Sequence, residues 1–299
     1  MKRKSISFLK RAIKKTYRKF PFKKHIFSIL KKLNVPNDKF YRHLTFNGKI
    51  EVNLEDKSFY MFNYGGTIEN EVFWKGISNT WEEETIWLWI KLCKSSKIIF
   101  DIGANTGIYS LIAKTVNPSA KVFAFEPSEE TFPKLVYNDK INNTNIITEK
   151  IALSNESGTK IFYDIFEPNQ TSASLSPDKL KNFEGYTGKI NEYKVRSETL
   201  SDYIQNNNIT HIDLMKIDVE LHEPEVIEGF GNFLFQFKPT IIIEVLTTEV
   251  AEKLNTILNF SGYHYYHLEK EKLQKVDKLF VVDKKWNFLL SPDVISLYL

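Results

Sequence analysis

The stretch from Ile98 to Ser110 reads IIFDIGANTGIYS, and it predicts a strand, a glycine-containing loop and the start of a helix. The apolar run ends at Asp101, the loop carries Gly103 and Gly107, and helical spacing of apolar residues follows. Glycines in such a loop let the backbone come close to a bulky polar group. Taken alone, the stretch is compatible with a nucleotide-like ligand and with a plain structural turn.

The rhythm of short apolar strands and helices continues along the chain. The predicted strands are 98–102, 121–125, 146–150, 212–219 and 241–245, and the predicted helices are 106–116, 129–142, 199–206, 224–230 and 248–261. Two further strands, YHYYHLE and KLFVVDKK, are separated only by a loop and predict a closing antiparallel hairpin. We therefore expect an α/β fold with a mostly parallel sheet that is covered by helices on both faces.

The segment 154–198 interrupts this alternation. It contains a predicted strand, TKIFYDIF, followed by the polar loop PNQTSASLSP. The hydroxyls and amides of that loop suit a carbohydrate, so we expect the loop to cover an acceptor.

Charge divides the chain into two unequal parts. Residues 1–49 hold sixteen Lys or Arg and one acid, whereas residues 50–299 hold 25 bases and 36 acids. We expect three segments: a basic amphipathic helical arm at 1–43, a short β-rich segment at 44–80 and a ligand-binding domain at 81–299. Residues 1–40 suit contact with an anionic membrane surface, and packing on the acidic body of the same chain is the other interpretation.

Composition restricts the class of protein. Cys93 is the only cysteine, which argues against a disulfide framework and a zinc finger. No apolar run approaches the roughly 18 residues that span a bilayer, and lysines interrupt every candidate for a signal peptide. We expect a cytoplasmic protein that is membrane-peripheral if its basic arm binds lipid.

The predicted site lies at the carboxyl ends of the strands. Asp101, Gly103, Asn105 and Gly107 follow the first strand, and Glu126 ends the next one, where its carboxylate can accept hydrogen bonds from both hydroxyls of a ribose. The spacing G-x-x-x-G lacks the third glycine of a nicotinamide site, and no Lys-Ser/Thr pair follows as in a P-loop. The pattern fits S-adenosylmethionine, which has no pyrophosphate.

An ordered set of motifs strengthens this interpretation. DIGANTGIYS, AFEP, IALSNESG, ETLSDYI, LMKIDVELHEPEVIEG and IIIEV follow one another as in the FkbM-type methyltransferases, which the chain resembles over roughly residues 80–283. The resemblance implies a Rossmann-like class I fold with a seven-stranded sheet, S-adenosylmethionine as cofactor and O-methylation of sugars or secondary metabolites. It also implies that Glu84 meets the methionine end of the cofactor, although an acid in a first helical turn is also a plain dipole partner. Asp101 and Gly103 would line methionine and ribose, and Ala152 and Leu153 the adenine.

The candidate catalytic residues follow the strand IDLMKIDV. Because a sugar hydroxyl is a weak nucleophile, a general base would help, and we expect Asp218 in that role, then Glu220, with His222 as a third candidate. Asp218 as a helix cap and His222 as an exposed loop residue are the structural alternatives. The chain reads KIDVELHE where the family usually has KIDVEG, so Leu221 replaces a glycine.

Other functions stay open at this point. Asp218, Glu220, Glu223 and Glu244 could hold Mg²⁺, but they lack a tight ligand spacing, so no metal is expected. The basic arm alone favours a nucleic-acid substrate, whereas the absence of N-P-P-Y and D-P-P-Y runs argues against it. A non-catalytic binding module is the third alternative. The sequence therefore favours a small-molecule or glycan O-methyltransferase.

Overall fold

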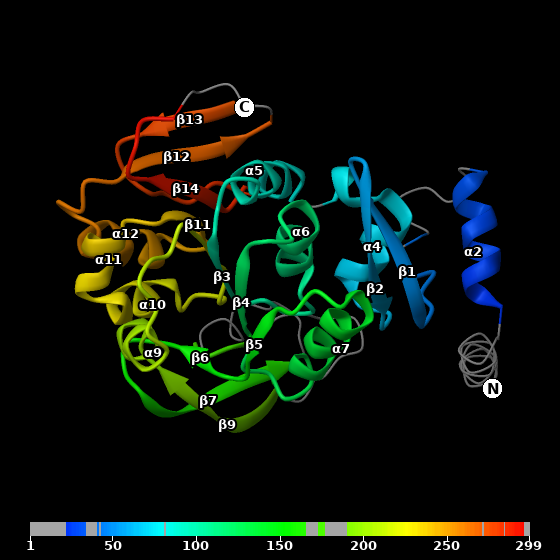
Figure 1. Ribbon diagram of the computed structural model, residues 1–299, viewed down its shortest axis with the longest axis horizontal. Coiled ribbons are helices and arrows are strands. Elements are labelled where there is room, and N and C mark those ends of the chain that lie inside the picture. The colour runs from blue at the N-terminus through cyan, green and yellow to red at the C-terminus, as the bar shows by residue number, and fades with distance from the viewer. Residues whose placement is uncertain are drawn as a thin grey trace, which may run out of the picture.

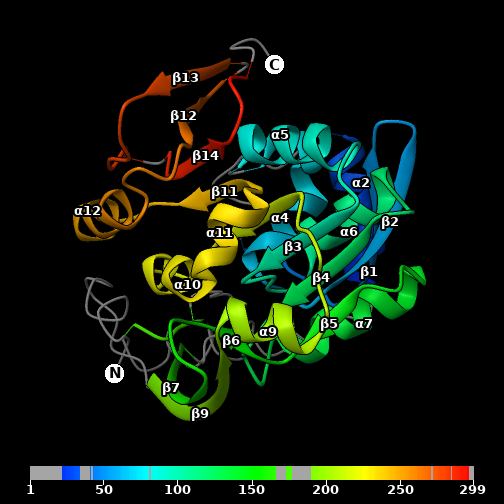
Figure 2. The same ribbon diagram turned by 60° about the vertical axis from the view of Figure 1, so that its left-hand side comes forward.

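An eight-stranded sheet forms the centre of the protein, as the computed structural model shows (Figures 1 and 2). The structure describes residues 22–33, 41, 43–80, 82–165, 173–176, 190–270, 272–283 and 285–295. The strand order is β13-β12-β14-β11-β10-β3-β4-β5. Its strands are β3 (Ile98–Ile102), β4 (Lys121–Phe125), β5 (Ile147–Glu149), β10 (Leu214–Ile217), β11 (Thr240–Glu244), β12 (His264–Glu269), β13 (Lys272–Val276) and β14 (Asn287–Ser291).

The five strands from β11 to β5 are parallel, and β14, β12 and β13 are antiparallel. Successive residues of β3 point to opposite faces, so Ile99 joins one hydrophobic core and Phe100 the other. Helices α5 (Glu83–Cys93), α6 (Ile108–Val116) and α7 (Phe132–Asn142) contribute to the first core. Helices α9 (Leu200–Asn206), α10 (Glu223–Phe230), α11 (Asn232–Phe237) and α12 (Thr248–Ile257) contribute to the second. The α/β class and the mixed sheet agree with the expectation from the sequence.

The closing part of the sheet differs from the prediction. The sheet has eight strands rather than seven, and KLFVVDKK is a connection between β13 and β14 instead of a strand. The physical reason lies at Leu279, whose backbone N–H and C=O both bond to the side chain of Asn255, at 2.9 Å each. Because Asn255 satisfies this backbone, the segment can bury Leu279 without joining the sheet.

A second, four-stranded sheet lies beside the first, in the order β6-β9-β7-β8. It contains β6 (Ala152–Leu153), β7 (Gly158–Ile165), β8 (Ala173–Ser174) and β9 (Ile190–Glu198). The sequence predicted β7, but it did not predict β9. Only residues 173–176 of the polar loop PNQTSASLSP belong to the described part of the chain.

The segment 44–80 contains a hairpin, β1 (Gly48–Leu54) and β2 (Lys57–Asn63), followed by α4 (Thr67–Lys75) and the short helix η1 (Ile77–Asn79). The segment thus combines the expected strands with a helix and a short helical turn. Strand β2 is joined to α7, because Asn138 Oδ1 accepts from Phe62 N and Asn142 Oδ1 from Tyr60 N.

Helix α2 (Lys23–Lys32) lies outside this hairpin (Figure 1). Its buried Phe27 packs against Phe46 and Trp74, with ring centroids 6.1 and 5.6 Å away. The first part of the predicted basic arm, residues 1–21, lies outside the described residues. In the described part of the chain, no helix is long and apolar enough to cross a bilayer.

Candidate active site

A cavity of about 560 Å³ extends along the carboxyl ends of the parallel strands. From one end to the other it passes Ala152 after β5, Glu126 after β4, Gly103 after β3, Asp218 after β10 and Glu244 at the end of β11. This edge is where ligands bind in open α/β sheets, and the volume suits a ligand of nucleotide size.

The glycine loop after β3 is held close to the neighbouring strands. Gly103 has φ +80°, and a Cβ placed on it would lie 1.8 Å from the backbone oxygen of Asp218. The N–H groups of Gly103 and Ala104 both donate to the carbonyl of Phe125, at 3.0 and 2.9 Å. Only glycine allows this approach of the β3 and β10 loops.

Glu126 is fixed at the rim by two backbone N–H groups. Ser128 N donates to Oε1 at 2.8 Å and Asn105 N to Oε2 at 2.9 Å, and the residue is 6% exposed. Asn105 itself has φ +51° and accepts at Oδ1 from Thr106 N. Burial raises the pKa of Glu126 to about 7, although both N–H groups favour the charged form.

The end of the cavity beside Glu126 is apolar. Ala152 and Leu153, which the sequence assigned to the adenine, line it. Phe125, Ile151, Phe162 and Leu175 complete this wall. A flat aromatic base would find matching apolar surface there.

Two of the predicted cofactor residues do not line the cavity. Asp101 is 1% exposed, accepts a hydrogen bond from Ser110 Oγ at 2.6 Å and lies beneath the cavity floor, where burial raises its pKa. Gly107 precedes α6 with φ +91°, and a Cβ on it would meet Leu135 at 2.6 Å. Both residues support the glycine loop from below.

Glu84, which the resemblance assigned to the methionine end of the cofactor, does not line this cavity either. It lines a separate, smaller cavity with Trp87, whereas Glu82 lines the main one. Glu82 accepts hydrogen bonds from Tyr109 Oη and from Asn287 Nδ2, the latter at 3.2 Å. A signal was present in the sequence, because Glu82 precedes the buried Ile86, Trp89 and Cys93 at helical spacing.

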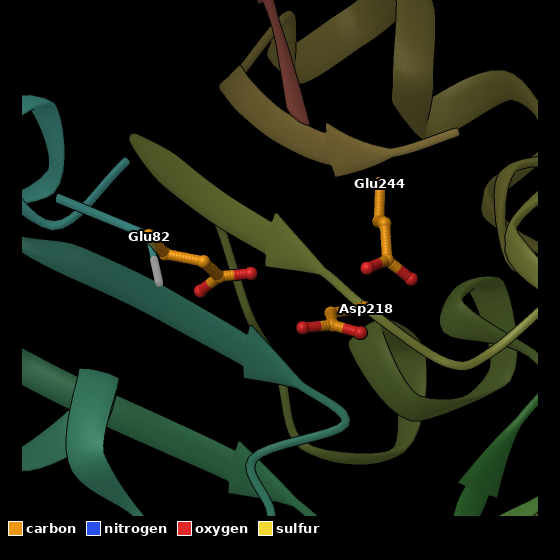
Figure 3. Close-up of side chains that lie close together, drawn as sticks. All are labelled: Glu82, Asp218 and Glu244. Carbon is orange, nitrogen blue, oxygen red and sulfur yellow. The ribbon is translucent and has the colours of Figure 1, made fainter. Parts of the chain in front are cut away.

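Three carboxylates meet at the far end of the cavity (Figure 3). Oxygen atoms of Glu82, Asp218 and Glu244 lie within 4.8 Å of one another. Lys216 donates to Asp218 Oδ2, and its Nζ lies 4.3 Å from the centre of the Tyr109 ring. Burial opposes the charge on Lys216, but the nearby carboxylates outweigh burial and raise its pKa above the usual lysine value.

The turn after β10 has an unusual backbone. Glu220 and Leu221 have φ +58° and +77°, in the region that favours glycine, at the place where Leu221 departs from the family pattern. Ser174 Oγ of β8 donates to the carbonyl of Glu220 and so joins the second sheet to this turn. Glu220 is among the residues that line the cavity.

His222 lines the cavity, and its Nε2 is engaged by the hydroxyl of Ser154. Its Nε2 lies 2.9 Å from Ser154 Oγ, and its Nδ1 lies 3.5 Å from Glu225 Oε2. Burial lowers its pKa to about 4, and the charges of Lys160 and Lys253 act in the same direction. The imidazole is therefore neutral at neutral pH and holds the turn in place.

A mixed α/β sheet, a glycine loop after its first parallel strand and the carboxylate of Glu126 at the end of the next are together typical of a nucleotide-binding α/β protein. The cavity continues beyond this part of the site to Asp218 and Glu244. Residues 101–269 match the Methyltransferase FkbM domain family. The chain therefore belongs to the FkbM methyltransferase family, whose cofactor is S-adenosylmethionine. The residues fit this cofactor. The carboxylate of Glu126 is held in an orientation that suits the two hydroxyls of a ribose, and the apolar wall beside it suits an adenine. The acidic side chains of the cavity suit the positive charges at the methionine end of S-adenosylmethionine.

Individual relatives support this assignment. The hexuronic acid methyltransferase AglP of Haloferax volcanii is 29% identical over 179 residues, which cover 58% of this chain and 66% of AglP. The 31-O-demethyl-FK506 methyltransferase FkbM of Streptomyces tacrolimicus is 30% identical over 154 residues, which cover 44% of this chain and 58% of that protein. The chain thus spans about two thirds or less of these two relatives.

Solved structures show similarity at low sequence identity. A methyltransferase FkbM from Methylobacillus flagellatus has a TM-score of 0.40 at 14% identity, with 66% of this chain and 44% of that chain covered. Fibrillarin from Aeropyrum pernix, with natively bound S-adenosyl-L-methionine, has a TM-score of 0.42 at 10% identity, with 82% of each chain covered.

Proposed function

We propose that the protein is an S-adenosylmethionine-dependent O-methyltransferase that acts on a hydroxyl of a sugar, glycan or secondary metabolite. One observation carries the proposal: a single cavity joins Glu126 and the glycine loop to Asp218 and Glu244. The names of the relatives AglP and FkbM, which refer to a hexuronic acid and to an O-demethyl compound, agree with it.

In this proposal the cofactor occupies the part of the cavity between β5 and β3. Glu126 accepts hydrogen bonds from the ribose hydroxyls, and Ala152 and Leu153 contact the adenine. Gly103 and Asn105 shape the loop beneath the methionine. Glu82, rather than Glu84, contacts the methionine end of the cofactor. Asp101 and Gly107 support this loop but do not contact the cofactor.

Asp218 is the proposed general base. When bound, S-adenosylmethionine supplies a methyl group on an electrophilic sulfonium. Lys216 holds Oδ2 of Asp218, so the carboxylate is oriented and Oδ1 faces the acceptor hydroxyl. Glu220 is the second candidate because it also lines the cavity beside Asp218. We assign His222 to positioning, since both of its ring nitrogens face protein groups.

Calorimetric titration with S-adenosylmethionine tests this function. We expect binding in the micromolar range, about −8 kcal/mol, and at least tenfold weaker binding by Glu126→Gln. Glu129→Gln, at a neighbouring residue whose side chain is 64% exposed, is the matched control. No binding by the folded wild-type protein would reject the methyltransferase and leave a non-catalytic module.

We also propose that the basic arm contacts an anionic membrane surface. The exposed apolar residues of α2 and its ends are Phe22, Ile26, Ile29 and Leu33, and they follow one another at helical spacing. Phe27 faces the body of the protein, so this apolar stripe faces away from it. Lys23 and Lys32 flank the stripe, and residues 1–33 carry thirteen Lys or Arg and no acid.

Sedimentation with vesicles of phosphatidylserine and phosphatidylcholine tests this contact. Ile29→Glu should reduce the bound fraction severalfold, because it places a charge in the apolar stripe. Phe235→Glu, at an exposed phenylalanine of α11, should have no effect. Equal sedimentation of the wild type and Ile29→Glu would reject the membrane role.

A further inference from the structure

The end of the cavity beyond Asp218 is acidic. Among the described residues that line the cavity, six are Asp or Glu, and Lys216 is the only Lys or Arg. Three of the six, Glu82, Asp218 and Glu244, converge at this end, and Lys216 already bonds to one of them. A negatively charged group placed there would meet several carboxylates and no uncommitted lysine or arginine of the described lining.

A neutral side chain lies behind this group of carboxylates. Asn287 is 6% exposed, lies opposite Glu244 in the β11–β14 pairing and gives its amide nitrogen to Glu82. Within the described structure, its buried Oδ1 has no hydrogen-bond partner. Asn287 does not line the cavity itself, so its contribution here is to hold the carboxylate of Glu82 in place.

The remaining wall is apolar. Trp286 and Leu246 line the same end, and Trp286 is only partly buried. An indole face beside carboxylates is a suitable surface for a sugar ring, which presents C–H groups on its faces and hydroxyls at its edge.

We infer that the acceptor is an uncharged sugar ring that donates several hydroxyl hydrogen bonds, and that uronic acids are excluded. This inference rests on the proposed function, and it separates the chain from the hexuronic acid named for its relative AglP. Asp218 and Glu244 accept from the hydroxyls, and together with the nearby Glu82 they repel a carboxylate on the ring.

Ligand-observed NMR tests the inference with a matched pair of probes. Methyl β-glucoside and methyl β-glucuronide differ at one position, where a hydroxymethyl group is replaced by a carboxylate. Each is titrated to 50 mM with protein saturated by S-adenosylhomocysteine at pH 7.5, without metal and with EDTA present. We expect the glucoside to bind at least tenfold more tightly than the glucuronide.

Variants identify the source of the discrimination. Glu244→Gln removes one charge with little change in shape, so it should reduce the ratio of the two affinities at least threefold. Glu252→Gln, on the exposed side of α12, should leave the ratio unchanged. An unchanged ratio in Glu244→Gln would overturn the assignment to these acids.

Other outcomes would also overturn the inference. These are equal or tighter binding of the glucuronide, binding of neither sugar, and glucuronide binding that requires added Mg²⁺, which would mean that the three carboxylates hold a cation instead. The titration with S-adenosylmethionine tests the proposed function independently of the sugar titrations. A protein that binds S-adenosylmethionine but prefers the glucuronide retains the proposed function and loses only this inference.

Discussion

Glu126 combines burial with a fixed orientation. Its two oxygens each accept a backbone N–H, so the carboxylate is held in place before any ligand arrives. Burial nevertheless disfavours the charge, and the pKa of about 7 is the result of these opposed effects. The residue is thus preset for binding at a cost in folding stability.

That cost predicts a pH dependence of stability. The folded pKa of about 7 lies above the ordinary value of 4.5, so the folded protein holds a proton that the unfolded chain has lost between these values. The contribution of Glu126 therefore falls as pH rises from about 4.5 to 7, by about 3 kcal/mol at most. In thermal melts without cofactor, the Tm of the wild type should fall relative to that of Glu126→Gln between pH 5 and pH 8. A constant difference in Tm would contradict the raised pKa.

Asp218 allows a separation of binding from chemistry. Asp218→Asn keeps the shape of the side chain and removes the proposed base, so kcat for a sugar acceptor should fall about 10²- to 10⁴-fold. The Kd for S-adenosylmethionine should change little, as calorimetry can measure. Unaltered turnover would transfer the role to Glu220.

At the scale of elements, the turn from Asp218 to His222 carries backbone strain. Leu221 has φ +77° and packs its side chain against the second core. Glycine in this position would lose the packing and the strain, whereas alanine would lose only the packing. We therefore expect Leu221→Gly to be more stable than Leu221→Ala by about 1 kcal/mol, as urea unfolding can measure. If Leu221→Ala were the more stable variant, as alanine usually is where φ is negative, the backbone strain at Leu221 would be contradicted.

The elements that the sequence predicted well share a strong local pattern. Strands β3, β4 and β11 are short apolar runs between turn signals, and such strands are buried on both faces. Strand β9 was missed because its alternation of exposed and buried residues is weak and many of its residues are polar. KLFVVDKK has the pattern of a strand, but the side chain of Asn255 replaces the neighbouring strand, and local periodicity does not reveal such a tertiary contact.

At the scale of the whole molecule, parts of the site could be predicted because parallel strands end at one edge. The order of β3, β4 and β10 in the sequence was enough to place Gly103, Glu126 and Asp218 at that edge. Asn287 and Trp286 could not be found in this way, because antiparallel pairing brings β14 back to β11. The place of Glu82 in the site could not be predicted either, because it depends on the orientation of α5, and packing against α6 sets that orientation.

The two ends of the cavity are also lined by different parts of the sequence. Apart from Glu82, the residues that we propose to face the cofactor come from β3 to β6, in the middle of the sequence, whereas Trp286 and Glu244 come from its last third. The acceptor wall can therefore change by substitution near the C-terminus while the glycine loop and Glu126 stay as they are. A chimaera that exchanges β14 and the loop before it between two relatives would alter acceptor preference and retain cofactor affinity. Under the proposed function, the antiparallel return of the chain would supply a replaceable specificity segment beside a constant cofactor site.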